Sequence, residues 1–324
     1  MSDSPVDQIL RLLFSSRRVV GGTSDPCTTN PCEECFALQR PKVEHFMKEG
    51  VPIHFVIPAF PAKSPNRQKT LGDLPDLGER LALEFLQSFC DYVCHFYEPG
   101  AKITICSDGH VFSDLVGVAD EDVTAYRTEL EALLKAIGSD SITTYGLEDA
   151  FQSTDYAEQR DKLTNQYALS VEEIRQRALD DPAARGIFDG MHRFMFEDQW
   201  AQSEGRSRNS VRESSKGLAY QVIQRSDAWS VLVEDFFPDA LRLSIHPQVP
   251  HSKKIGVHMI RTRDNWLTPW HGVALDEGDG IRLVKREEAE RLGATVVMRG
   301  GRPSHFIAPQ AVHTSQLLLQ EATR

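Results

Sequence analysis

A proline-rich stretch at residues 58–67 carries the side chains best suited to bind a small charged molecule. It reads PAFPAKSPNR, so two cations, a hydroxyl and an amide follow one another closely in a segment stiffened by prolines. Ammonium, guanidinium, hydroxyl and amide groups together can donate several hydrogen bonds to one phosphate or carboxylate. The predicted anion-binding residues are Lys63, Ser64, Asn66 and Arg67.

A second polar segment, residues 107–114, reads SDGHVFSD and offers two carboxyl groups. We predict that Asp108 and Asp114 act as general acid and base, since each stands beside a turn where it can exchange a proton with a bound molecule. Both also have a structural alternative. An Asp-Gly pair is common in turns, and an aspartate often caps the start of a helix.

Alternation over residues 240–247 places three polar side chains on one face of a predicted strand. Leucine and isoleucine occupy the other face, while Arg242, Ser244 and His246 share this one. Such a face is either a pocket wall or a solvated surface. In a pocket, the planar guanidinium of Arg242 is well matched to a carboxylate.

Trp270 and His271 follow a rigid proline and have two interpretations. They can stack on a substrate and protonate it, or they can pack inside the protein, which is the usual role of an isolated histidine. We predict that His246 and His271 are the alternative proton carriers after the two aspartates.

The elements that must position these residues form a strand-helix-strand pattern. Residues 51–57 and 101–106 are predicted strands, and residues 78–97 between them have helical spacing. Each strand runs into one of the two polar segments, and ligands of open α/β sheets bind at the carboxyl ends of the strands. We therefore predict a Rossmann-like α/β fold, a mostly parallel sheet flanked by helices, in one large domain over residues 1–324.

The middle of the chain, about residues 150–215, is predicted to be a helical insertion or cap. Residues 155–202 are mostly helical in pattern, while residues 203–217 are rich in serine, glycine and cations and are predicted to be exposed and mobile. Lys216 lies at the end of this segment, beside the next helical pattern. There it is predicted to close over an anionic substrate.

Six cysteines are too few for a disulfide framework in 324 residues. Cys27, Cys32 and Cys35 lie close together in the sequence. Structural zinc sites usually contain two Cys-x2-Cys pairs, and here only Cys32 and Cys35 form such a pair. We therefore predict free thiols and no metal.

The overall charge argues against nucleic acid as a partner. There are 47 acidic and 36 basic residues, which give a formal net charge of −11. Residues 9–14 are apolar but too short and too charged for a signal peptide, and no later run is long enough to span a membrane. We expect a cytoplasmic protein.

Five blocks taken together resemble the isocyanide (isonitrile) synthase family, which is related to pyoverdine/dityrosine biosynthesis proteins. They read PAFPAKSPN from residue 58, LPDL from residue 74, SDGHVFSD from residue 107, RLSIHP from residue 242 and TPWH from residue 268. The resemblance runs in order from about residue 26 to 285. Residues 150–210 contain no matching motif.

The resemblance implies a Rossmann-like enzyme of the lyase or carbon-transfer type. Members convert the amino group of an aromatic amino acid, tyrosine or tryptophan, to an isocyanide with a carbon from ribulose 5-phosphate. It implies no cofactor, and a product that passes to an iron- and 2-oxoglutarate-dependent oxygenase. For this reaction we expect Lys63, Ser64 and Arg67 to hold the phosphate. We expect Asn66 to orient a sugar hydroxyl and Arg242 to clamp the amino-acid carboxylate.

Other functions remain open on the residues alone. A sugar-phosphate or nucleotide transferase would use the same anion loop, although no glycine-rich phosphate motif follows a strand. A non-catalytic phosphosugar sensor would need the loop without the aspartates and histidines around it. An iron oxygenase ranks last, because no convincing set of histidine and carboxylate ligands is present.

Overall fold

A five-stranded parallel sheet forms the centre of the molecule, as the sequence predicted. The computed structural model describes residues 4–20 and 26–309. The strands lie in the order β3-β2-β1-β4-β5, and every neighbouring pair is parallel. They are β1 (Ile53–Ile57), β2 (Ala101–Cys106), β3 (Ile142–Tyr145), β4 (Leu241–Ser244) and β5 (Ile255–Gly256).

The strand order reverses direction at β1. The chain moves from β1 through β2 to β3 on one side, and β4 and β5 are added on the other side. Ligand sites of such sheets lie where the order reverses, at the carboxyl ends of the strands. The crevice between β1 and β4 is therefore the expected site.

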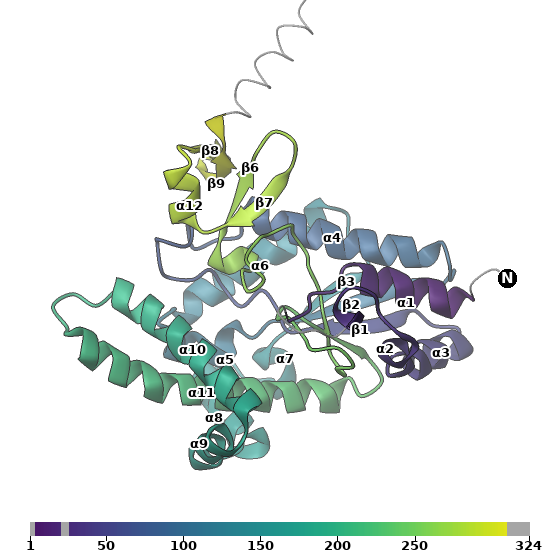
Figure 1. Ribbon diagram of the computed structural model, residues 1–324, viewed down its shortest axis with the longest axis horizontal. Helices are drawn as coiled ribbons and strands as arrows, with labels where there is room; N and C mark the ends of the chain where they lie inside the picture. Colours follow the sequence, from purple (N-terminus) through teal and green to yellow (C-terminus); the bar gives the residue numbers. More distant parts are fainter. Residues whose placement is uncertain (1–3, 21–25, 310–324) are drawn as a thin grey trace, which may run out of the picture.

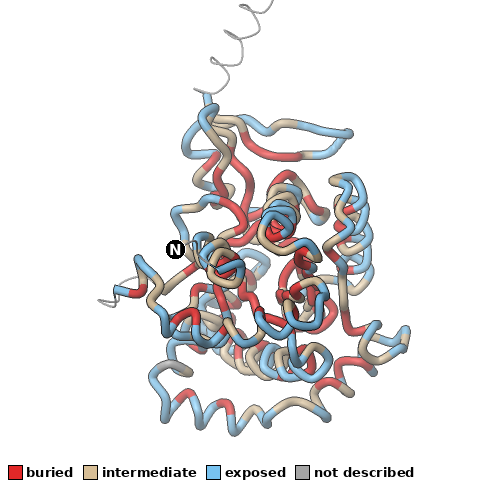
Figure 2. Tube along the Cα trace, turned by 90° about the vertical axis from the view of Figure 1, so that its right-hand side faces the viewer, coloured by how far each residue is buried: buried red, intermediate tan, exposed pale blue. Residues whose placement is uncertain are grey.

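One face of the sheet is covered by helices from the first half of the chain (Figure 1). Alternate residues such as Ile53, Phe55 and Ile57 are completely buried against them, and Figure 2 shows this buried interior within an exposed shell. These helices are α1 (Pro5–Ser15), α3 (Arg40–Glu49), α4 (Leu77–Cys94) and α6 (Asp120–Ala136).

The opposite face packs on a different set of helices. Val56 and Cys106 point to this side, where they meet Trp229 and Leu232. The helices on this side are α5 (Gly109–Val116), α7 (Leu147–Phe151), α8 (Tyr156–Tyr167) and α11 (Arg208–Phe236). Shorter elements elsewhere are η1 (Pro26–Thr28), α2 (Glu33–Ala37) and η2 (Pro269–His271).

The helical insertion is present, but its predicted mobile segment is mostly helix. α9 (Val171–Asp180) and α10 (Pro182–Ala201) precede α11, and α10 and α11 lie side by side (Figure 1). Residues 208–217 belong to α11, so the prediction of a mobile stretch over 203–217 was wrong for them. The Ser207 hydroxyl caps the helix by accepting from the Ser210 amide, and α10 provides a packing surface that composition does not reveal.

A second, smaller sheet follows the central one. Its strands β6 (Val273–Asp276), β7 (Ile281–Val284), β8 (Thr295–Arg299) and β9 (Arg302–Ile307) lie in the order β7-β6-β9-β8, with α12 (Arg286–Arg291) between β7 and β8. The sequence analysis did not predict this separate sheet. Short turns join β6 to β7 and β8 to β9, and short turns favour antiparallel pairs. Among the described residues, no helix is long and apolar enough to cross a membrane.

Candidate functional site

The two polar segments predicted to meet do lie against each other. The Ser107 hydroxyl donates to the carbonyl oxygen of Phe60 at 3.0 Å. A Cβ on Gly109 would lie 2.0 Å from the carbonyl oxygen of Pro61, so only glycine allows this approach. The two segments thus meet at the carboxyl ends of β1 and β2, and this meeting point is the candidate crevice.

Asp108 lies in this crevice with a carboxyl group that the fold leaves unsatisfied. It precedes α5 but its side chain makes no capping hydrogen bond, and its buried Oδ1 has no partner among the described residues. Burial raises the pKa of Asp108 to about 7. A carboxyl with this pKa exchanges protons readily near neutral pH, as a general acid or base must.

Lys63 is enclosed within the protein, and this corrects its predicted role. Its Nζ lies 2.8 Å from both Asp76 Oδ2 and Glu79 Oε2, and it donates to the Pro269 carbonyl at 3.1 Å. An ammonium has three N–H groups, and three acceptors occupy them. The side chain is 0% exposed, so no donor remains for a phosphate.

Glu79 completes this buried group. It accepts from the Tyr126 hydroxyl at 3.2 Å and from the Asp76 backbone amide at 2.9 Å. Burial raises the pKa of Glu79 to about 7, although the Lys63 ammonium opposes the shift. The group ties the end of the proline-rich loop to the start of α4 and is part of the scaffold.

The remaining anion-binding residues converge on a carboxylate from the helical insertion. Asp198 of α10 accepts from Ser64 Oγ at 3.3 Å, from Asn66 Nδ2 at 3.2 Å and from Lys69 Nζ at 2.5 Å. Lys69 also lies over the ring of Phe194. The sequence analysis missed both Lys69 and Asp198. The position of Lys69, just beyond Arg67, could have indicated its role, whereas no sequence feature indicated Asp198.

Arg67 lies farther out than its neighbours. Its side chain is 52% exposed and its guanidinium binds Asp73 at 2.5 Å. Exposed ion pairs of this kind contribute little and exchange easily. Arg67 is therefore available to a ligand that approaches from solvent.

Trp270 packs inside the protein, as the second interpretation held. It is 1% exposed, its ring lies 5.1 Å from that of Phe60, and its carbonyl accepts from the Ser64 amide at 2.9 Å. A substrate has no face of this ring on which to stack. Trp270 instead holds the anion loop in place.

His271 faces the same crevice from η2. Its Nδ1 lies 3.0 Å from Thr268 Oγ1, and the edge of its ring meets Phe194 at 4.8 Å between centroids. Burial lowers its pKa to about 3. The imidazole is therefore neutral at physiological pH.

The polar face of β4 is a buried wall and not a solvated surface. Arg242 is 7% exposed, and its two Nη atoms donate to the carbonyl and hydroxyl of Ser230 at 3.1 Å. Its Nε is buried without a partner, and no carboxylate among the described residues forms an ion pair with it. A buried guanidinium without a counter-ion is suited to an anionic ligand.

Ser244 and His246 continue this wall toward solvent. The Ser244 hydroxyl is occupied by the His246 backbone amide at 3.1 Å and by Gln248 Nε2 at 3.2 Å. His246 is exposed at the rim, with its ring 5.8 Å from that of Trp266. Ser244 shapes the loop after β4, and His246 is open to a ligand.

Asp114 and Lys216 are engaged elsewhere. Asp114 pairs closely with Arg225 and lies 3.7 Å from Arg160, so two cations hold its carboxylate. It lines a cavity of about 170 Å³ that Asp198 also borders. Lys216 is half-buried on α11 and binds Glu213 at 2.7 Å, and no described contact links it to the anion loop.

The three N-terminal cysteines form a group away from this crevice. The structure brings Cys27, Cys32 and Cys35 together with His251, a residue more than two hundred positions later. This arrangement calls the prediction of no metal into question, because spacing along the chain could not include the histidine.

Comparison with known proteins identifies the family. The family model described as pyoverdine/dityrosine biosynthesis protein matches residues 43–297. The chain belongs to this family. The chain is 47% identical to L-tryptophan isonitrile synthase AmbI2 of Fischerella ambigua over 315 residues, 97% of this chain and 95% of that protein. It is 41% identical to the L-tyrosine isonitrile synthase of Pseudomonas aeruginosa over 309 residues, 94% of this chain and 94% of that protein.

A solved structure agrees with the family assignment. The crystal structure of the PvcA protein from Pseudomonas aeruginosa superposes with a TM-score of 0.89 at 41% identity, covering 94% of this chain and all of that one. The predicted fold class and the predicted family are thus confirmed. The family match also covers the whole of the helical insertion, where no motif was recognised in the sequence.

Proposed function

We propose that this chain is an isonitrile synthase that converts the amino group of L-tryptophan or L-tyrosine to an isonitrile, with ribulose 5-phosphate as the carbon donor. Relatives named as synthases for these two amino acids match nearly the whole chain, which supports the enzyme class and the substrates. The carbon donor is inferred from the reaction expected of the family and from the cationic loop beside the crevice.

The buried carboxyl group of Asp108 is the observation that best supports an enzymatic function. The reaction must move protons several times, because the amine condenses with the sugar ketone, water leaves, and later steps expel phosphate and break a carbon–carbon bond. A buried, uncapped carboxyl with a pKa of about 7 at the ligand edge of the sheet suits these transfers. A sensor that only binds a phosphosugar has no use for such a group.

His271 is the second proton carrier in this proposal. It is neutral, it faces the crevice, and its Nδ1 is held by Thr268. The carboxylate of Asp108 accepts a proton as an anion, whereas the imidazole of His271 accepts one as a neutral group. The two residues can therefore serve different steps. Asp114 is a weaker candidate, since Arg225 and Arg160 already hold its carboxylate.

Arg242 is the proposed clamp for the amino-acid carboxylate. Its Nε has no acceptor among the described residues, and the substrate carboxylate would supply one. Its place on β4, next to β1, puts it at the reversal point of the strand order.

The phosphate site is proposed to use Lys69 in place of Lys63. Lys69, Ser64 and Asn66 already share one anionic acceptor, the carboxylate of Asp198. A phosphate dianion would compete with Asp198 for these donors, and Arg67 would join from the exposed side. The insertion helix α10 would thus contact the sugar phosphate directly.

The product is proposed to pass to an iron- and 2-oxoglutarate-dependent oxygenase, the partner implied by the family's chemistry. An isonitrile carbon is a good metal ligand, so a free product would be reactive in a cell. Direct measurement of product consumption by such an enzyme tests this step separately from synthesis.

Isotope labelling tests the proposed reaction. The purified chain is incubated with L-tryptophan or L-tyrosine and ribulose 5-phosphate uniformly labelled with carbon-13, and the product is examined by infrared and mass spectrometry. We expect an isonitrile stretch that shifts with the label and a product heavier by one carbon-13. An unlabelled isonitrile would rule out this carbon donor, and no product with either amino acid would favour a binding protein.

A further inference from the structure

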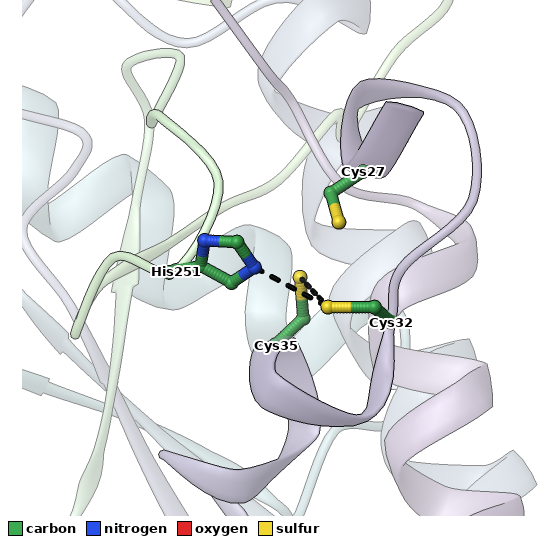
Figure 3. A group of neighbouring side chains, drawn as sticks. All are labelled: Cys27, Cys32, Cys35 and His251. Carbon is green, nitrogen blue, oxygen red and sulfur yellow. Dashed lines mark hydrogen bonds between the residues drawn. The ribbon is translucent and has the colours of Figure 1, made fainter. Parts of the chain in front are cut away.

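We propose that Cys27, Cys32, Cys35 and His251 bind one zinc ion that joins the N-terminal segment to the loop between β4 and β5. Their ligand atoms, three sulfurs and one imidazole nitrogen, all lie within 4.8 Å of one another (Figure 3). Three cysteines and one histidine are one of the usual ligand sets of structural zinc. This inference is independent of the proposed reaction.

The distances fit a tetrahedral ion. Cys32 Sγ lies 3.8 Å from Cys35 Sγ and 3.3 Å from His251 Nε2. With zinc–sulfur bonds of about 2.3 Å, two sulfurs at tetrahedral positions lie about 3.8 Å apart. A disulfide would bring the two sulfurs to about 2.0 Å, so the pair is not arranged as a disulfide.

The local structure presents these atoms to one point. Cys32 and Cys35 stand at the start of α2, and Cys27 lies in η1 just before it, while His251 comes from a distant loop (Figure 3). Cys32 is at the N-cap position but caps no amide. His251 has a φ of 60°, a left-handed backbone that is strained for a residue other than glycine. Strain of this kind persists where a contact requires it.

The proposed ion would brace a loop that borders the crevice. The loop after β4 carries His246 and His251, and then Lys254, whose Nζ lies 3.0 Å from Ser230 Oγ. The same hydroxyl binds Arg242. Zinc would therefore hold the outer wall of the Arg242 site without contacting a substrate.

Metal analysis of the full chain tests the proposal. The protein is purified under reducing conditions without a metal-binding tag, and zinc and iron are measured by mass spectrometry. We expect about one zinc per chain. The Cys94→Ser variant, which removes an exposed thiol elsewhere, should keep it, and Cys32→Ser and His251→Asn should each lose most of it.

A cobalt experiment avoids dependence on variants that fold poorly. Wild-type protein stripped of metal and given Co²⁺ should show the absorption of tetrahedral cobalt with sulfur ligands. The proposal is overturned if the reduced wild-type chain retains neither zinc nor cobalt after gel filtration. It is also overturned if iron replaces zinc, or if alkylation of fresh lysates recovers Cys32 and Cys35 as a disulfide.

Discussion

At the scale of single residues, the neighbours of a charged group decide its function. Lys63 and Lys69 lie in the same loop, yet two buried carboxylates and a carbonyl surround Lys63, while Lys69 reaches across to the insertion helix. Asp108 and Asp114 differ in the same way, since only Asp108 lacks a cationic partner. The residue proposed to be functional in each pair is the one whose bonds the fold leaves incomplete or replaceable.

Substitution of Asp108 by asparagine tests its proton transfer. Asparagine has nearly the same shape but does not ionise, so we expect kcat to fall by about 100-fold or more while the fold is retained. In the wild type, kcat/KM should rise with pH through about 7 as Asp108 ionises to accept a proton, and the variant should lack this inflection. Asp91→Asn, on the exposed side of α4, serves as the control; wild-type kcat in Asp108→Asn would remove Asp108 from the mechanism.

Arg242→Lys tests the carboxylate clamp. Lysine keeps the charge but loses the free Nε and the planar geometry. We expect the KM for the amino acid to rise about tenfold or more, which corresponds to one charge-assisted hydrogen bond. Ser230→Ala removes the hydroxyl that accepts from Arg242, leaves the Ser230 carbonyl in place, and should affect KM much less. An unchanged KM in Arg242→Lys would contradict the assignment.

His271 should make stability depend on pH in a defined direction. Its folded pKa of about 3 is below its ordinary value of 6.5, so the folded state binds fewer protons than the unfolded state between these values. The contribution of His271 to the free energy of unfolding is fully present above pH 6.5. It is lost as the pH falls, by at most about 1.4 kcal/mol per pH unit. Urea unfolding of His271→Gln should show a weaker loss toward low pH than the wild type. Equal slopes would indicate that His271 is protonated in the fold.

At the scale of elements, α10 has a role beyond covering the sheet. Its Asp198 joins three residues of the loop after β1, and its Phe194 contacts both Lys69 and His271. The loop after β1 in turn is held by α4 through Lys63 and by η2 through Trp270. The crevice therefore combines the loop after β1 and the adjacent α4 with α10 and η2, which lie far from them in sequence.

Two lysine variants separate the scaffold from the site. Lys63→Met leaves Asp76 and Glu79 buried without a cation, and we expect the free energy of unfolding to fall by about 3 to 5 kcal/mol. Lys69→Met should lower stability less, because Asp198 still accepts from Ser64 and Asn66, but it should raise the KM for the sugar phosphate. The reverse pattern, a stable Lys63→Met with a raised sugar-phosphate KM, would restore Lys63 to the phosphate site.

At the scale of the whole molecule, the N-terminal segment and the loop after β4 form one structural unit. The Arg18 amide donates to the Gly256 carbonyl at 2.6 Å, and its guanidinium donates to the Ile245 carbonyl at 2.6 Å. The proposed zinc site lies beside these contacts. The outer wall of the crevice thus depends on Arg18, near the start of the chain, and on the loop between β4 and β5.

Hydrogen exchange should reveal this unit when metal is removed. Peptides over residues 26–37 and 246–256 should exchange faster after chelation, because the zinc-dependent contacts open locally. Peptides from β1 and β2 should be unchanged, since their amides lie in the centre of the sheet. Faster exchange throughout the chain would instead mean that the ion stabilises the whole fold.

The sequence by itself determined the regular elements and the family. Alternating and helical patterns of apolar residues predicted β1, β2 and α4 to within a few residues, because burial of one face is a local property of the chain. Proline, glycine and aspartate at the strand ends marked the two loops that meet in the crevice. Five short blocks of residues identified the family.

Only the tertiary structure decided which polar residues are free to act. It enclosed Lys63, buried Trp270, placed Lys216 on the surface, and brought Asp198 to Lys69 and His251 to the cysteines. Each of these outcomes depends on contacts between residues many positions apart. A hydrogen bond or an ion pair requires atoms within about 3 Å, and distance along the chain does not give that separation in space.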